Sequence, residues 1–341
     1  SAFAKQSGAD IVIPKKEQEG PAATGDYYVS KSGSDSNDGT SAATAFATIA
    51  KAVETAAAGS KVSVLEGTYE LSAEISVAKA ISIIGAGRDK TIVKAASGKN
   101  IRLFTLDAGA KIEGMTLTGG RVGPGAAALV KNGTVSWCLI TDNISSAHSA
   151  HGGAISFTSG QGTIDHCIIS DNKTTGQVAY GAGIGGDGPT GAITVDSCLI
   201  INNKITGNGS GGGIGIKNSN YDLIVRNCTI MGNTGTLYTG GIRREGGSGS
   251  MTLINDIVSG NAYGSGGAAS TPNNINGGNI ADGSKNCFFD TKNEADRVSG
   301  SIYGSLTLDG EYRPLESSAV VGAGATYVLS GNLRTGKLVM E

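Results

Sequence analysis

The chain has 341 residues, with 27 Lys and Arg against 29 Asp and Glu, 55 glycines and only 5% aromatic residues. The near-zero net charge and the lack of a basic stripe argue against nucleic-acid binding, and no apolar run reaches the length of a membrane span. Many glycines and few aromatic side chains favour short strands joined by tight turns over a conventional packed globule.

The N-terminal part of the chain divides into two segments. Residues 1–25 are polar and contain two prolines, which predicts a disordered linker. Residues 26–60 are predicted to form an N-terminal cap, because apolar residues recur at helical spacing within Thr44–Ala58 and Gly59 ends the pattern. Residues 61–341 are predicted to form the body of the protein.

Four nonapeptides in the body align with one another: VSWCLITDN, IDHCIISDN, VDSCLIINN and VRNCTIMGN. Their cysteines are separated by 29, 31 and 30 residues, and a fixed period of this length indicates one structural unit stacked on itself. A second motif keeps the same phase, as HGGAI, YGAGI, SGGGI and TGGI. The pattern predicts an all-β parallel β-helix of about 30 residues per coil, and the crossover rule makes it right-handed.

Alternation within each unit predicts which side chains are buried. The cysteine and the isoleucine two positions after it point inward, as in Cys167 with Ile169, and the cysteines form a column of small buried side chains. Adjacent strands lie about 4.8 Å apart, whereas a disulfide needs Cβ atoms about 3.8 Å apart, so no disulfide is expected. Each unit ends in asparagine, which predicts a buried asparagine ladder of Asn143, Asn172, Asn203, Asn233 and Asn261.

One column of outward charges is a candidate catalytic site. Asp165, Asp196 and Arg226 occupy equivalent positions on three successive coils, at the corner before the cysteine. Two carboxylates about 5 Å apart beside a guanidinium could bind Ca²⁺ and a uronate, or act as a general acid and base. The structural alternative is a solvated column in which Arg226 neutralises the two acids.

A second column precedes the ladder asparagines and is a candidate metal site. It contains Asp142 and Asp171, followed by Asn202 and Gly232 on the next coils. Ca²⁺ is the cation that such a column would bind, and no motif indicates another cofactor. The alternative is that these residues only cap backbone amides at a turn.

The glycine-rich strands offer a third candidate, a flat face for substrate binding, with Ser156, Gly185 and Gly215 among its outward positions. This face is expected to end in Arg243, Arg244 and Glu245, with Tyr238 nearby, and could hold an acidic sugar chain. The alternative is a strand that simply needs little side chain. Of the three histidines, His148, His151 and His166, the first two lie in one loop and form a poor metal pair without a third ligand, and no catalytic serine motif is present.

Both ends of the chain resemble a known family. The segment YYVSKSGSDSNDGTSAATAFATIAKAVETAAAGSKVSVLEGTYE with AISIIGAGRDKTIV behind it, and the C-terminal YRPLESSAVVGAGA and LSGNLRTGK, are similar to secreted bacterial pectate-lyase-like right-handed β-helix proteins. The GGAI and xxN repeats also resemble polymorphic outer-membrane proteins and autotransporter passenger stalks. The resemblance implies a secreted or cell-surface protein, with a lipid anchor through a removed N-terminal segment as one arrangement.

Three functions are consistent with these observations. The first is a monomeric surface protein that binds a polysaccharide or cell-surface glycan without catalysis, which fits the absence of recognisable polygalacturonase or pectate-lyase motifs. The second is a polysaccharide lyase or glycoside hydrolase acting on an acidic glycan. The third is the passenger or stalk part of an adhesin or IgA-protease-like surface protein.

Overall fold

The computed structural model describes most of the predicted body and cap. Residues 1–24 of the predicted linker and nearly all of the C-terminal segments that carry the family resemblance lie outside the described residues, as do a few short internal segments. The described residues are 25–187, 191–217, 220–264, 271–284, 287–295 and 297–304, with the backbone of two strands at 327–329 and 338–340.

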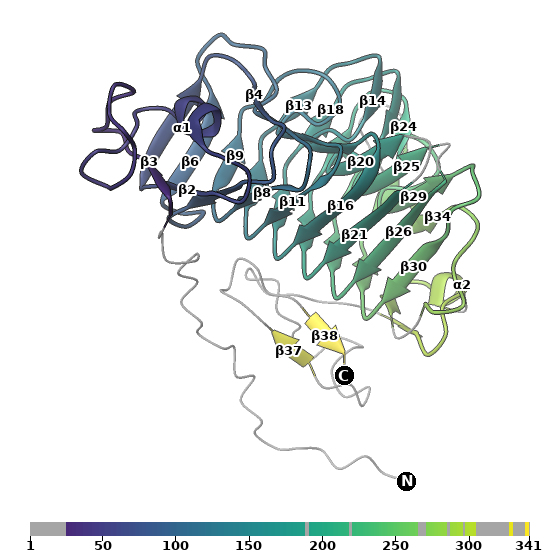
Figure 1. The fold of residues 1–341 in the computed structure, drawn as a ribbon. Coiled ribbons are helices and arrows are strands. Elements are labelled where there is room, and N and C mark those ends of the chain that lie inside the picture. Colours follow the sequence, from purple (N-terminus) through teal and green to yellow (C-terminus); the bar gives the residue numbers. More distant parts are fainter. Residues whose placement is uncertain are drawn as a thin grey trace.

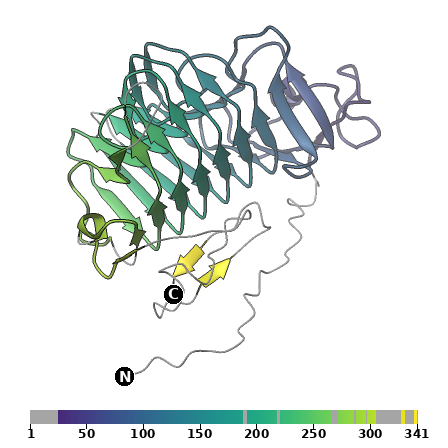
Figure 2. The same ribbon diagram turned by 180° about the vertical axis from the view of Figure 1, so that it is seen from behind.

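Within the described residues, the chain coils so that successive turns add one strand to each of three long sheets (Figures 1 and 2). Strand pairs in these sheets are parallel. The nine strands of sheet A are β1 (Tyr27–Val29), β2 (Lys61–Val64), β5 (Ser82–Gly85), β8 (Ala110–Glu113), β11 (Gly133–Ser136), β16 (Gly160–Asp165), β21 (Gly191–Asp196), β26 (Tyr221–Arg226) and β30 (Met251–Ile254).

Sheets B and C form the other two long walls of the coil. The ten strands of sheet B are β3 (Gly67–Leu71), β6 (Thr91–Ala95), β9 (Thr116–Thr118), β12 (Leu139–Thr141), β17 (Ile168–Ser170), β22 (Leu199–Ile201), β27 (Thr229–Met231), β31 (Ile257–Ser259), β35 (Phe288–Phe289) and β36 (Ile302–Tyr303). The eight strands of sheet C are β4 (Ile75–Val77), β7 (Phe104–Leu106), β10 (Ala128–Val130), β15 (Ile155–Phe157), β20 (Ile184–Asp187), β25 (Ile214–Lys217), β29 (Ile242–Glu245) and β34 (Ile275–Asn276).

Shorter strands form additional sheets between the long walls. Sheet D contains β13 (Ile144–Ser145), β18 (Lys173–Thr174), β23 (Lys204–Ile205), β28 (Thr234–Gly235), β32 (Ala262–Tyr263) and β33 (Thr271–Pro272). Sheet E contains β14 (Ser149–His151), β19 (Val178–Tyr180) and β24 (Gly209–Ser210). Near the C-terminus, β37 (Tyr327–Leu329) pairs antiparallel with β38 (Leu338–Met340).

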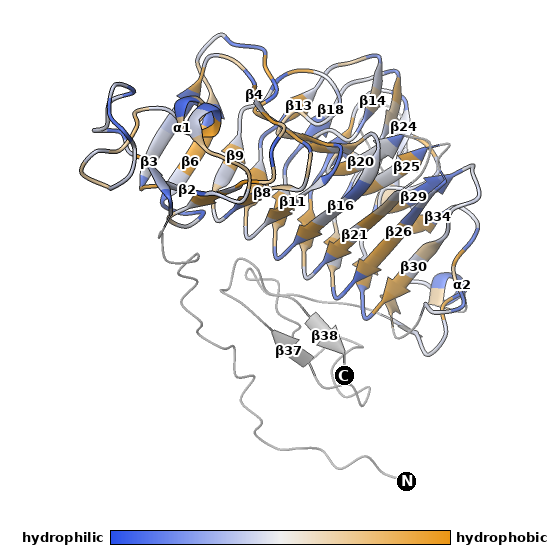
Figure 3. Ribbon diagram, in the orientation of Figure 1, coloured by the Kyte–Doolittle hydropathy of each residue, from blue (hydrophilic) through white to orange (hydrophobic). Residues whose placement is uncertain are grey.

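The interior of the coil is apolar and continuous, because equivalent residues of successive coils stack in register. Ile164, Val195 and Val225 are consecutive in one such column, and all three are fully buried. Hydrophobic residues concentrate on the strands of sheet A, whereas the turns between coils are largely hydrophilic (Figure 3). The prediction of a parallel β-helix is confirmed.

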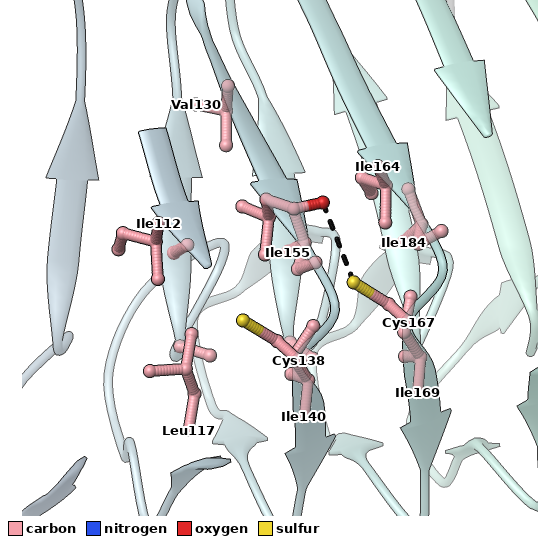
Figure 4. Packing of buried hydrophobic residues seen from close by; sticks show 14 of the residues in the cluster. Ile112, Leu117, Val130, Cys138, Ile140, Ile155, Ile164, Cys167, Ile169 and Ile184 are labelled. Atoms are coloured by element: carbon pink, nitrogen blue, oxygen red, sulfur yellow. Dashed lines mark hydrogen bonds between the residues drawn. The ribbon is translucent and has the colours of Figure 1, made fainter. Parts of the chain in front are cut away.

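The cysteine column lies inside this core, as predicted. Figure 4 shows Cys138 and Cys167 among Ile112, Ile140 and Ile164. All five cysteines are buried free thiols. Burial raises the pKa of the Cys138 and Cys198 thiols well above the ordinary value, so both stay protonated and act as small apolar groups.

Two corners recur with a left-handed backbone conformation on the coils that carry the repeat. At the corner before the ladder asparagine, φ is +55° at Asp142, +57° at Asp171 and +56° at Asn202, and glycine occupies the same position at Gly232. Glycine, asparagine and aspartate tolerate this conformation better than other residues. The corner geometry therefore accounts for the residue types in the predicted calcium column.

The asparagine ladder is present and extends one residue beyond the prediction. Each Nδ2 donates to the Oδ1 of the asparagine on the next coil, over distances of 2.9–3.0 Å. The same Oδ1 also accepts from the backbone N–H of the previous asparagine, as Asn203 Oδ1 does from Asn172 N. The ladder consists of Asn143, Asn172, Asn203, Asn233, Asn261 and Asn274.

The predicted capping helix exists but is shorter than Thr44–Ala58. Helix α1 spans Ile49–Thr55, with Thr48 as its N-cap. Phe46 does not join the helix, because its N–H and C=O bond to Tyr28 and Ser30 as an added strand position. The Asp35 carboxylate also accepts the backbone N–H groups of Ala47 and Thr48, which holds the segment before the helix extended.

The other described helix, α2 (Lys292–Ala295), is also short. In the described part of the chain, no helix has the length and apolar character needed to cross a membrane.

The asparagine ladder should contribute to stability, and the neighbouring residue Asn202 provides a control variant. Replacing Asn203 by Ala leaves the amide groups of Asn172 without their acceptor, and we expect the free energy of unfolding to fall by about 3 kcal/mol. The exposed Asn202→Gly variant keeps the left-handed corner and should unfold like the wild type. Urea unfolding followed by circular dichroism measures both, and equal loss in the two variants would contradict a special role for the ladder.

Candidate functional site

The predicted catalytic residues lie in register on the corner that follows sheet A. Asp165, Asp196 and Arg226 pair on strands β16, β21 and β26. Arg226 Nε donates to Asp196 Oδ2 over 2.8 Å. Asp165 has a different neighbour, with its Oδ1 lying 3.4 Å from His166 Nδ1. The structure thus joins Asp196 to Arg226 and places Asp165 beside an imidazole.

The Asp196 carboxylate is held by further donors from the same corner. Ser197 Oγ donates to Asp196 Oδ1 over 2.8 Å, and Asn227 Nδ2 donates to the same oxygen over 3.2 Å. Arg226 donates to the other oxygen, so donors from three residues hold this carboxylate at both of its oxygens. Such saturation is typical of an anion that orders a corner, and it favours the structural interpretation for Asp196.

The predicted metal ligands Asp142 and Asp171 are exposed on adjacent coils. Their left-handed φ values explain the presence of aspartate without a cation. Among the residues that the structure describes, no three His, Cys, Asp or Glu side chains gather as a metal site would require.

The glycine-rich face is not the open surface that the sequence suggested. Sheet E packs over the outward side of sheet C, so Ser156 is only 1% exposed and Gly185 is buried. A Cβ on Gly185 would lie 2.0 Å from Gly152 N, and one on Gly215 would lie 2.2 Å from Gly181 N. The glycines therefore admit a second layer of backbone, and the prediction of a flat binding face at these positions is wrong.

A polar cluster lies where the layer formed by sheet E meets the ends of the sheet C strands. The His151 ring stacks on Tyr180 with centroids 5.5 Å apart, and its Nε2 lies 3.5 Å from Asp187 Oδ2. Lys217 Nζ lies 5.6 Å from the centre of the Tyr180 ring. The Tyr180 hydroxyl donates to Glu245 Oε2, two coils further along.

Arg243 completes the cluster from β29, which is coloured largely hydrophilic in Figure 3. Its Nη2 lies 3.4 Å from Glu245 Oε2, and its Nη1 donates to Asn276 Oδ1. The guanidinium stacks over the Tyr238 ring at 4.6 Å, and Tyr238 is 54% exposed. We call this group the Tyr180 cluster, defined as His151, Tyr180, Asp187, Lys217, Tyr238, Arg243, Glu245 and Asn276.

Arg244 does not belong to the surface, contrary to the prediction. It is 4% exposed and follows Gly186 and Ile216 in an inward column of sheet C. Its Nη1 donates to Gly246 O over 3.0 Å. Burial lowers the pKa of the guanidinium, while the Asp222 carboxylate opposes that shift. The alternation of side chains along β29 explains the difference, since Ile242 points inward and Arg244 must follow it.

Charge and burial set the protonation of the two rings in the cluster. Burial lowers the pKa of His151, with Lys217 acting in the same direction and Asp187 against it. Burial raises the pKa of Tyr180, and the bond to Glu245 raises it further. At neutral pH the cluster therefore presents a neutral imidazole and a protonated phenol, which donates to a carboxylate.

Sequence reasoning found Tyr238, Arg243 and Glu245 but missed His151 and Tyr180. Both residues stand at the same place in the repeat, since His151 opens HGGAI and Tyr180 opens YGAGI. That position is in register on β14 and β19, where His151 pairs with Tyr180. A chemically distinctive side chain at the same phase of two consecutive repeats was therefore the available clue.

Comparisons with known proteins agree with the architecture. A family model described as a right handed beta helix region matches residues 100–293. The pectate lyase Pel9A superposes with a TM-score of 0.50 at 14% identity, covering 91% of this chain and 96% of that chain. The pectin methylesterase PemA from Erwinia chrysanthemi gives a TM-score of 0.42 at 15% identity, covering 91% and 100%. Among curated protein sequences there is no match.

The buried His151 predicts how stability depends on pH. Its folded-state pKa lies below the ordinary value of 6.5, so the unfolded chain takes up a proton first as the pH falls. This contribution to stability is therefore complete above pH 6.5 and is lost as the pH falls through the folded-state pKa. Melting temperatures at pH 7.5 and 5.5 should differ more for the wild type than for His151→Asn.

The exposed His148 supplies the matched control for this experiment. His148→Asn should keep the pH dependence of the wild type. If His151→Asn also kept it unchanged, the assignment of a lowered pKa to His151 would be contradicted.

Proposed function

The chain belongs to the family of right-handed β-helix proteins, and we propose that it is a secreted or cell-surface protein that binds a polysaccharide through the Tyr180 cluster. The observation that carries the proposal is the pair formed by Tyr238 and Arg243. One face of an exposed tyrosine ring lies under a guanidinium held by Glu245 and Asn276. Such a fixed ring suits the apolar face of a sugar.

A row of alternating charges beside this ring supports the same function. Asp187, Lys217 and Glu245 are in register on β20, β25 and β29, about 4.8 Å apart from one coil to the next. Their polar groups alternate acceptor, donor and acceptor along the axis of the coil. A polysaccharide carries hydroxyls at repeated intervals along one direction, which matches such a row.

The rigidity of the scaffold also supports binding. Every residue of the row sits on a strand bonded to both neighbouring coils, and Tyr180 reaches Glu245 across two coils. Little side-chain or backbone freedom is lost when a ligand settles on groups fixed in this way. The similar fold of Pel9A, a pectate lyase, is a further argument for a polysaccharide as the ligand.

Catalysis on an acidic glycan, as a lyase or glycoside hydrolase, is the second candidate function. The observation in its favour is the contact between Asp165 and His166, which places a carboxylate and an imidazole together on a partly exposed corner. Asp196 and Arg226 lie on the next coils. In this alternative Asp165 and His166 act as general base and general acid, taking a proton from the glycan or its attacking water and giving one to the leaving oxygen. Arg226 with Asp196 positions the substrate.

Binding and turnover can be separated in one set of experiments. Purified protein is tested by affinity electrophoresis in gels that contain pectate, alginate, xylan or a neutral glucan, with and without Ca²⁺. The same polysaccharides are then incubated with the protein, and unsaturated uronate absorbance and reducing ends are followed. Retarded migration without new products supports binding, whereas products that disappear in Asp165→Asn support catalysis.

The Tyr180 cluster predicts which variants lose binding. Tyr238→Ala and Lys217→Met should each weaken retention about tenfold, which corresponds to a ring or charge contact of about 1.4 kcal/mol. Tyr303→Ala and Lys204→Met are matched controls, because Tyr303 is 52% exposed on β36 and Lys204 is exposed on β23, both away from the cluster. Equal effects of test and control variants would refute the proposed site.

The third candidate function is a passenger or stalk segment of a larger surface protein. It predicts neither retention nor turnover with any polysaccharide in the panel.

A further inference from the structure

The corner that follows sheet A carries two aromatic residues with a left-handed backbone conformation, which is unusual for tryptophan. At this corner φ is +54° at Trp137 and +50° at His166. The equivalent positions on other coils are Gly114, Ser197, Asn227 and Asn255. Glycine and asparagine, like the histidine of His166, enter the left-handed region more readily than most residues. Tryptophan is the least suited of these residues to the corner, so its presence calls for an explanation other than backbone preference.

The two rings form a flat stack on the surface. Their centroids lie 4.1 Å apart with an angle of 19° between the planes, and both residues are partly exposed. The contact between His166 Nδ1 and Asp165 Oδ1, at 3.4 Å, fixes the orientation of the imidazole. Trp137 is the one tryptophan of the chain. The stack therefore exposes part of an indole whose position is set by its neighbour.

The surroundings of the stack indicate the chemistry of a ligand. The position before Trp137 in the column is Gly114, which has no side chain to cover the indole. The residues before Gly114 and His166 are Glu113 and Asp165, and both carboxylates are partly exposed. A flat apolar surface bordered by hydrogen-bond acceptors suits a group that has an apolar face and donates hydroxyls at its edge.

The charge of the corner distinguishes between two ligands of this shape, an acidic uronate and a neutral sugar. Two cations of sheet A near this corner are paired with carboxylates, Lys111 with Glu113 at 2.6 Å and Arg226 with Asp196 at 2.8 Å. A uronate carboxylate would meet the carboxylates of Glu113 and Asp165 at this corner, whereas the hydroxyls of a neutral sugar can donate to them.

We propose that this corner binds a ring of a neutral saccharide, with its C–H face on the Trp137 indole and its hydroxyls donating to Glu113 and Asp165. The site lies where β8, β11 and β16 leave sheet A, whereas the Tyr180 cluster lies beside sheet C, so the two sites share no residue. The inference goes beyond the proposed function and does not depend on the Tyr180 cluster.

Tryptophan fluorescence tests the site directly, because the sole indole of the chain is the proposed contact. The protein of 341 residues is titrated with cellohexaose, xylohexaose, mannohexaose and trigalacturonate. We expect a saturable change of emission with at least one of the neutral oligosaccharides and a weaker response or none with trigalacturonate. A flat emission signal with all three neutral oligosaccharides overturns the proposal.

Variants distinguish a binding role from a structural one. Trp137→Asn should reduce affinity for the responding oligosaccharide at least tenfold by calorimetry and should leave the melting temperature unchanged or higher, since asparagine suits a φ of +54°. Unchanged affinity, or a melting temperature lowered by several degrees, contradicts the proposal. Trp137→Phe keeps an aromatic face and should retain part of the affinity.

The Tyr180 cluster provides the control that separates the two proposals. Tyr238→Ala should leave the fluorescence response intact even if it abolishes retention in polysaccharide gels. Loss of the response in Tyr238→Ala would show that one site accounts for both observations, and would overturn the inference of a separate site.

Discussion

The structure depends on one constraint, which is that each coil must satisfy the buried polar groups of the next. The asparagine ladder shows how this is done. The Nδ2 group of Asn203 donates to Ile169 O and to Asn233 Oδ1, while its Oδ1 accepts two N–H groups of Asn172. All the hydrogen-bonding capacity of a buried amide is thus used between coils. The repeat length, the register and the tightness of the corners follow from keeping these amides aligned.

The corners required by this alignment decide which polar residues carry information about function. A left-handed position selects glycine, asparagine and aspartate for conformational reasons, as at Asp142 and Asp171. A residue type that the corner disfavours, such as Trp137, is more informative. The buried glycines of sheet C are also there for a conformational reason. Gly185 and Gly215 admit the backbone of sheet E and thereby bring Tyr180 close to the strand ends.

The sequence was sufficient for the coil, the cysteine column and the ladder, because each depends on a period of about 30 residues or on alternation along a strand. Arg244 could also have been placed inside by alternation from Ile242. The layer of sheet E could not have been predicted, because its strands have two or three residues and no apolar alternation. The contact between Tyr180 and Glu245, which joins residues 65 apart, depends on that layer.

The two ends of the ladder show why a stacked scaffold also needs specific caps. The chain of amides has a direction, since it begins where Asn143 Oδ1 accepts the backbone N–H of Gly120 and each later Nδ2 donates forward. The last donor, Asn274 Nδ2, therefore needs an acceptor that no further asparagine supplies. The carboxylates of Asp290 and Glu294 accept it, and Glu294 also accepts the backbone N–H of Asn274 at 2.7 Å. Because Glu294 lies in α2 and is 8% exposed, this short helix closes the polar core as well as the apolar one.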